Sequence, residues 1–474
     1  MANEMGSAPD ELLSMFTQSS ELKNYFSRSG DHNELTSSIE RFLRSTMDEV
    51  RLRNAEDCAN RILRVADLHD LGMLREGVQK REASGSIAFQ GHRDHTAHTL
   101  NNWLLGWYIY SKCDKVKDAL SSAIEARHWP KEKFGHDEYF GHIWQYVSLL
   151  HDVGYLFEGS LGTMDPATQS AQASVGVRIL DDYFNARLWR DAELSSIHDQ
   201  RQLFNELGFQ PPEFRENQSL ARIAFSLRDL GDLRDVQAWL SEPHEGGKRP
   251  GDGASTPTLE LPGDAFELWK QHFNAFGYKE AADRIGKVED AFEWFVFRGL
   301  PKICIRVLDH AVCSGLTLLK IATVYYSLMA KVTLAGRNEA APDITKKVLS
   351  RPPVYDYDPE FWWTGIVWAT AATAVHNIQQ METPWYEDVK PKPLTIDEDP
   401  LSYLGILVDC IQEWDRYFVF ALPDRMPVQG IDVKIGVVDG KLVVDLGTHQ
   451  RAKSICSGLD KALHGWTDFV QIRP

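Results

Sequence analysis

The pair His151-Asp152 lies at the end of an apolar stretch, GHIWQYVSLLHDVGYLF, which covers residues 141–157. The hydrophobic residues before the pair predict a buried helix, and the Val-Gly-Tyr after it predicts that the helix stops there. An imidazole and a carboxylate in a nonpolar setting are costly unless a cation or hydrogen bonds compensate them. We expect that compensation to be a metal ion.

The His-Asp dipeptide alone does not identify such a site, because it also occurs at His69-Asp70, His136-Asp137 and His198-Asp199. His69-Asp70 lies in a stretch that fits an ordinary amphipathic helix, and His198-Asp199 lies in the polar stretch SSIHDQRQ. His151-Asp152 differs from these copies in its company. Four other segments each place a His or an Asp inside an apolar helical pattern: 93–110, 303–320, 368–379 and 400–417.

The candidate ligands in these segments follow the order His, His-Asp, His, His, Asp along the chain. This order resembles the HD superfamily of metal-dependent phosphohydrolases, in the longer form that can hold two metals. The resemblance implies a bridging role for Asp152. It also favours His98 as the first ligand, because a long apolar helix follows that residue as in the family. The implied metal ligands are His98, His151, Asp152, His310, His376 and Asp409.

Two other groups of residues complete the predicted site. His95 lies three residues before His98, on the same face of a helix, and is either a second ligand or a group facing the substrate. We assign catalysis to Asp152, His95 and Arg93. Arg306 precedes His310 by four residues and would share its helix face. The predicted substrate-binding cations are Arg306, Lys320 and Arg416.

Imidazole with carboxylate suits Mn, Fe, Co, Ni or Zn at one or two ions per chain, with Mg as a further candidate. The resemblance implies hydrolysis of a phosphate ester or anhydride, in a nucleotide such as an NTP or dNTP, by a metal-activated hydroxide. Val-Gly-Tyr stands where cyclic-diguanylate phosphodiesterases have Gly-Tyr-Pro, and the continuation typical of deoxynucleotide triphosphohydrolases is missing.

Two alternative functions belong to classes of protein other than the phosphohydrolases. The same ligand order serves mixed-valent di-iron oxygenases that resemble inositol oxygenase, and metal content with oxygen dependence would separate them from hydrolases. The other alternative is a helical nucleotide sensor or regulatory protein without catalysis.

Composition narrows the class of protein. The chain has 474 residues, 43% hydrophobic and 25% charged, which is typical of a globular protein with a sizeable core. Its net charge of −17 disfavours nonspecific binding of nucleic acid. Six cysteines without a CxxC pair indicate a reducing cytoplasm. No apolar run of about 18 residues predicts a membrane helix.

The fold expected is mainly α. Residues 1–85 form a helical region, and 86–420 form a helical bundle of the HD type. A helical insertion at 161–300, with an exposed loop at 241–257, interrupts that bundle. Residues 421–474 predict a β-hairpin around Asp439-Gly440 and a short helix. The insertion and this tail would suit a homo-oligomer.

Overall fold

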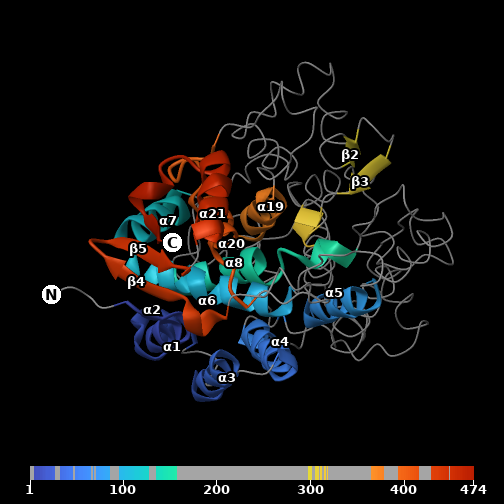
Figure 1. Cartoon of the computed structure of the whole chain (residues 1–474), viewed down its shortest axis with the longest axis horizontal. Helices are drawn as coiled ribbons and strands as arrows, with labels where there is room; N and C mark the ends of the chain where they lie inside the picture. The colour runs from blue at the N-terminus through green and yellow to red at the C-terminus, as the bar shows by residue number, and fades with distance from the viewer. Residues whose placement is uncertain are drawn as a thin grey trace, which may run out of the picture.

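The computed structural model describes a large part of the first third of the chain and of its last hundred residues (Figure 1). The described residues are 5–26, 32–45, 48–65, 68, 71–85, 95–126, 135–156, 297–300, 305–308, 310–311, 314–315, 318, 365–377, 393–415, 429–447 and 449–473.

The N-terminal region is helical, as the sequence predicts. Its helices are α1 (Ala8–Gln18), α2 (Ser20–Phe26), α3 (His32–Arg44), α4 (Asp48–Val65) and α5 (Gly72–Gly85). Ser7 starts α1, because its side chain accepts a hydrogen bond from the backbone N–H of Asp10. Helices α3 and α4 pack side by side, and α4 also packs on the central helix α6 (Thr96–Lys112).

Helix α6 is the centre of the bundle, and its residues Thr96–Tyr110 are buried on every side. It packs against α7 (Asp114–Ala126), α8 (His136–Leu149) and α20 (Pro400–Ile411). Another helix, α19 (Val367–Val375), lies between α8 and α20 in contact with both. A side chain at Gly106 would collide with the ring of Trp144, so this glycine lets α6 and α8 approach closely.

The small C-terminal sheet follows the predicted hairpin. Strands β4 (Lys434–Val438) and β5 (Lys441–Asp445) pair antiparallel, and Asp439 and Gly440 between them have φ of 51° and 76°. Positive φ at both central residues is what a type I′ hairpin turn requires. The predicted short helix is α21 (His449–Ala462), and two 3₁₀ turns, η8 (Gly430–Asp432) and η9 (Trp466–Asp468), flank this region.

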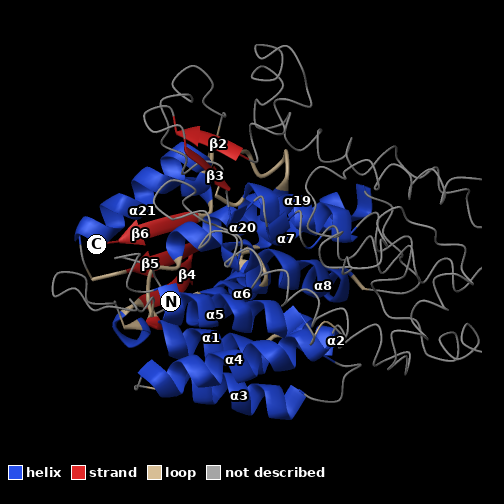
Figure 2. Cartoon of the chain, turned by 90° about the vertical axis from the view of Figure 1, so that its right-hand side faces the viewer, coloured by secondary structure: helices blue, strands red, loops and turns tan. Residues whose placement is uncertain are grey.

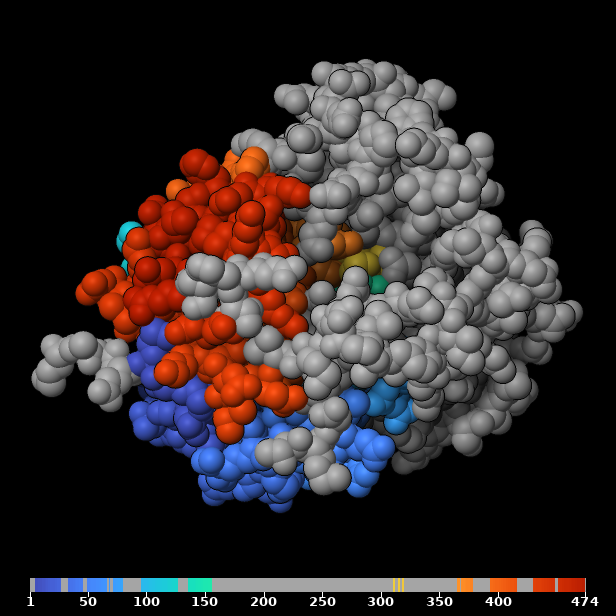
Figure 3. Space-filling view, in the orientation of Figure 1, coloured from blue at the N-terminus to red at the C-terminus, as the bar shows by residue number. Residues whose placement is uncertain are grey.

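The sheet has two further strands, one from near each end of the chain. Strand β1 (Gly6–Ser7) pairs antiparallel with β4, and β6 (Val470–Arg473) runs parallel to β5. The N-terminal helices (blue) and the C-terminal elements (red) therefore meet on one face of the molecule (Figure 3). In the view of Figure 2 the sheet lies at one end of the helical bundle.

One predicted helix is partly wrong. The segment 303–320 does not begin as a helix, because β2 (Phe297–Leu300) and β3 (Ile305–Leu308) form an antiparallel hairpin. Arg306 lies in β3 opposite Gly299, so it shares no helix face with His310. The β-branched residues Ile305 and Val307 on either side of Arg306 favour a strand. The strand β2 also lies inside the insertion that was predicted to be helical, and the predicted loop 241–257 is outside the described residues.

Within the part of the chain that the structure describes, no helix has the length and apolar character needed to span a bilayer.

Candidate metal centre

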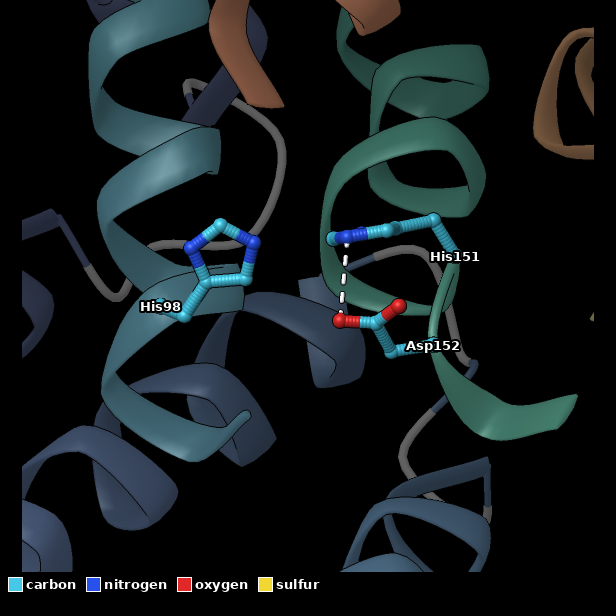
Figure 4. A group of neighbouring side chains, drawn as sticks. All are labelled: His98, His151 and Asp152. Carbon is cyan, nitrogen blue, oxygen red and sulfur yellow. Dashed lines mark ion pairs between the residues drawn. The ribbon is translucent and has the colours of Figure 1, made fainter. Parts of the chain in front are cut away.

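The central helices α6 and α8 bring the first three candidate ligands together. His98 lies in the first turn of α6, and His151-Asp152 lies in the turn between the end of α8 and the 3₁₀ helix η2 (Val153–Leu156). Figure 4 shows the His98 ring facing the His151-Asp152 turn from the neighbouring helix. His98, His151 and Asp152 are all at most 5% exposed.

The later candidates converge on the same place. Asp409 lies in α20, His376 is the C-cap residue of α19, and His310 lies two residues after β3. His98, His151 and Asp152 form one group with ligand atoms within 4.8 Å of one another, and Asp152, His310 and His376 form another. We call these the first and second triads. Asp152 belongs to both.

The two carboxylate oxygens of Asp152 face different histidines. Oδ2 lies 3.1 Å from Nε2 of His151 and 3.9 Å from Nε2 of His95. Oδ1 lies 3.7 Å from Nε2 of His310 and 3.7 Å from Nε2 of His376. Asp152 therefore presents one oxygen to each triad.

Asp409 adds a second carboxylate next to the first triad. Its Oδ1 lies 2.8 Å from Nε2 of His98 and 3.6 Å from Nε2 of His151. The Asn102 amide nitrogen lies 3.2 Å from Nε2 of His98 and 3.4 Å from the same Asp409 oxygen. Six side chains in all, the predicted metal ligands, are thus gathered in one buried cluster.

Hydrogen bonds on the far ring nitrogens orient these imidazoles. Nδ1 of His151 lies 2.7 Å from the carbonyl oxygen of Ser148, and Nδ1 of His376 lies 2.7 Å from that of Thr373. A carbonyl can only accept, so each Nδ1 carries a proton and donates it. In the neutral ring, Nε2 then has a lone pair directed at the cluster, which is the tautomer that binds a metal.

The residues present fit a metal ion. Two donors on one ion at about 2.1 Å each lie roughly 3.0–3.4 Å apart, close to the 2.8, 3.1 and 3.6 Å separations within the first triad and Asp409. Nε2 of His151 is buried and makes no hydrogen bond. A buried polar atom without a hydrogen bond is costly, and a cation among these atoms would satisfy it.

Charges in the cluster shift one another's protonation. Burial alone would raise the pKa of Asp152, but His151, His95 and His310 hold it well below its usual range. Burial would lower the pKa of His151, whereas Asp152 and Asp409 raise it to about 10. Burial and the neighbouring His151 and His310 lower the pKa of His376 to about 4. At neutral pH, with no metal bound, the cluster therefore keeps its carboxylates ionised, His151 protonated and His376 neutral.

An aromatic stack borders the second triad. Tyr155 stacks on His310 with ring centroids 4.0 Å apart and planes at 12°, and its ring centroid lies 4.2 Å from that of His95. Gly154 beside it makes this possible, because a Cβ there would lie 1.9 Å from the carbonyl oxygen of His310. The Gly154 N–H donates to Ser314 Oγ at 2.7 Å, which fixes the His310 segment against the His151-Asp152 turn.

Of the other predicted residues, only His95 is placed in the site. His95 is the N-cap residue of α6 and is 6% exposed. Arg93, Lys320 and Arg416 lie outside the described residues, as do His69-Asp70 and His198-Asp199, and only the backbone of Arg306 is described. His136 lies in the first turn of α8, where its Nε2 is 3.5 Å from a Glu125 carboxylate, away from the cluster.

The structure also shows two buried polar residues that the sequence did not reveal. Arg75 of α5 donates to Thr99 Oγ1 at 2.6 Å and to the Leu149 carbonyl at 2.7 Å, and so ties the start of α6 to the end of α8. Gln412 contacts Nδ1 of His98. Its spacing of three residues after Asp409 was the available signal. Arg75 had no such signal, because it is one of several charged residues in the sequence of α5.

Together the described residues form a compact cluster of imidazole and carboxylate groups. A cavity beside it is lined by Arg75, His95, Thr99 and Asp152 among others. Such a donor set can hold one or two borderline-soft divalent metals. No protein-family model, curated protein or solved structure matches this chain.

Proposed function

We propose that the cluster binds two divalent transition-metal ions and that the protein hydrolyses a phosphate ester or anhydride in a nucleotide. The observation that carries this proposal is the position of Asp152, whose two oxygens each face a separate histidine set. His98, His151 and Asp409 would hold one ion with Asp152, and His310 and His376 would hold the other with it.

Bound at this position, the metals would lower the pKa of coordinated water and offset the charge on phosphoryl oxygens. The chain's own residues would do the rest. The Nδ1–H bonds of His151 and His376 to backbone carbonyls keep their rings aimed at the cluster. Five of the six proposed ligands are buried, all but Asp409, and this burial keeps most bulk water away and strengthens the charge interactions inside.

His95 is the proposed proton-transfer group. Its Nε2 lies 3.9 Å from Asp152 Oδ2, at the edge of the first triad, and its ring lies beside Tyr155. A histidine near, but not within, the ligand set can take a proton from the attacking water or give one to the leaving oxygen. Arg93, two residues before His95, stays a predicted catalytic residue, and Lys320 and Arg416 stay predicted substrate-binding cations. Arg306 is left out of the proposal, because it lies in strand β3 and shares no helix face with His310.

The test is a screen of NTPs, dNTPs, cyclic nucleotides and dinucleoside polyphosphates with Mn²⁺, Co²⁺ or Mg²⁺, run with and without oxygen. We expect phosphate, pyrophosphate or triphosphate to be released without oxygen, and Asp152→Ala to abolish that release. His136→Ala is the matched control, because it alters the other His-Asp pair of α8 outside the cluster.

Two outcomes would replace the proposal. Turnover of a polyol or phosphonate that needs iron and oxygen would assign the site to a di-iron oxygenase. Nucleotide binding without turnover under every condition, with metal bound, would make the protein a sensor.

A further inference from the structure

Gln412 stands at the C-terminal end of α20, three residues after Asp409, and is fully buried. Its side chain makes two hydrogen bonds. The amide nitrogen donates to the carbonyl oxygen of Trp414, and the amide oxygen faces Nδ1 of His98. Gln412 therefore contacts a proposed metal ligand without itself belonging to either triad.

These two contacts fix the direction of the amide. A carbonyl oxygen can only accept, so the Trp414 carbonyl requires the NH₂ end of Gln412. The oxygen end then has to face His98, and it accepts a hydrogen bond from the Nδ1–H of that ring. His98 is thereby held with its proton on Nδ1 and with Nε2 directed at Asp409, 2.8 Å away.

The turn that carries Gln412 is held from outside the cluster. Asp415, with φ of 56°, accepts a hydrogen bond from the N–H of Gly430 at 2.9 Å and pairs with the buried Arg51. Arg51 also donates to the carbonyls of Phe42 and Ser45, near the end of α3. The backbone that offers the Trp414 carbonyl is thus anchored to the N-terminal helices, next to this ion pair.

We infer that Gln412 is a positioning residue that sets the tautomer of His98 and so prepares its Nε2 to bind metal. The other imidazoles with a described Nδ1 contact use carbonyls of their own helices, at Ser148 and Thr373. The carbonyl three residues before His98 belongs to His95, but it accepts from the Thr99 backbone and hydroxyl. Gln412 supplies from α20 the acceptor that His98 uses. This inference rests on the proposed metal site.

The experiment compares the affinity for Co²⁺ of the wild type, Gln412→Met and Gln412→Glu, by competition with a chelator. Methionine fills the same volume without an acceptor, and glutamate keeps the acceptor. We expect Gln412→Met to weaken binding about 10–100-fold, the usual effect of losing such a partner, and Gln412→Glu to bind at least as tightly as the wild type. Gln145→Met is the control, because Gln145 is equally buried on α8 but contacts Tyr25.

A space-filling role would give the opposite order, with Met tolerated and Glu harmful, and that result would overturn the inference. Equal affinities of the wild type and Gln412→Met for Co²⁺ would overturn this inference and leave the proposed function standing. If the wild type does not bind Co²⁺, the proposed function is overturned as well. Should the variants not fold, ¹⁵N-histidine NMR of the Zn²⁺-loaded wild type decides. The resonance that disappears in His98→Gln identifies His98 in the spectrum. A proton on Nδ1 of this ring supports the inference, and Zn²⁺ bound to Nδ1 refutes it.

Discussion

Two buried charged clusters lie a short distance apart in the chain, one on each side of the end of α20. At Asp415 the carboxylate pairs with Arg51, and the guanidinium also donates to carbonyls of Phe42 and Ser45. At Asp409 the carboxylate instead faces two histidines, and Nε2 of one of them, His151, has no hydrogen bond. In the first cluster the ion pair and the Gly430 N–H satisfy the carboxylate, although Nε of Arg51 is left without a hydrogen bond. The second brings four imidazoles and two carboxylates together, and among the described residues no Arg or Lys pairs with either carboxylate.

This difference separates a structural ion pair from a binding site. Both clusters pay the cost of removing charge from water. In the Arg51–Asp415 cluster that cost is offset by hydrogen bonds within the protein. Among the described residues, the carboxylates of the metal cluster have no Arg or Lys partner of this kind, which favours a cation from outside the chain. Buried charge alone is therefore a weaker sign of function than buried acceptors that point at one another.

The largest expected effect is the loss of bound metal from Asp152→Ala. This change removes an oxygen from each triad at once, so we expect elemental analysis to find no metal above background. The same change at His198-Asp199 or at His69-Asp70 should leave the metal content as it is. Metal retained in Asp152→Ala would show that the cluster around Asp152 is not the metal site, and the contrast with the Arg51–Asp415 ion pair would no longer hold.

Breaking the ion pair should lower stability instead. Arg51→Met leaves Asp415 buried without its cation and removes donors to the end of α3, so the free energy of unfolding should fall by about 3–5 kcal/mol. Denaturant titration measures this. The double variant Arg51→Met with Asp415→Asn keeps an oxygen for the Gly430 N–H and a residue type that tolerates the positive φ, so it should regain part of the loss. No recovery would mean that the uncompensated charge is not the cause of the loss.

Metal itself should stabilise the protein by a smaller amount. A ligand that binds only the folded state at a free concentration 100 times its Kd adds about 2.7 kcal/mol. The unfolding midpoint of chelator-treated protein should therefore rise steadily with added Mn²⁺ or Co²⁺. Asp152→Ala is the control and should show no such rise. A wild-type midpoint that ignores every metal tried would count against the site.

The smallest effect concerns an ion pair near the surface. Burial alone would raise the pKa of Glu21, but the hydrogen bond from Lys117, at 2.7 Å, and its charge lower it to about 2. A lowered folded pKa contributes stability above the unfolded value near 4.5 that is lost as pH falls toward 2. Glu21→Gln should cost at most about 1 kcal/mol at pH 7, and this difference from wild type should shrink in acid. A difference independent of pH would exclude the charge as its cause.

Much of the site could be predicted because its ligands are exceptions in apolar patterns. His98 lies at the start of an apolar run that folds as a buried helix, His151 lies just after the end of one, and Asp409 lies within one, so the cost of burying each was visible in the sequence. The hairpin was visible in Asp439-Gly440 for a similarly local reason. Local chemistry of this kind needs no knowledge of the tertiary fold.

The remainder depends on contacts between distant segments. Arg75 reads as an ordinary helix residue until packing places it between α6 and α8. The pairing of β1 with β4 joins Gly6 to Ile435, which no periodic pattern can indicate. Residues 305–308 fit a short strand as well as a helix, and an apolar run of that length does not decide between them.

The separation of the ligands along the chain has a consequence for biogenesis. His98 and Asp409 are 311 residues apart and touch across the cluster. At about 5–20 residues per second, ribosomes need roughly 13–50 s to pass from Asp152 to Asp409. The nascent chain holds an incomplete ligand set throughout that interval. If the cluster binds metal as proposed, the full site is loaded only after Asp409 has been translated, from whatever ions the surroundings then offer.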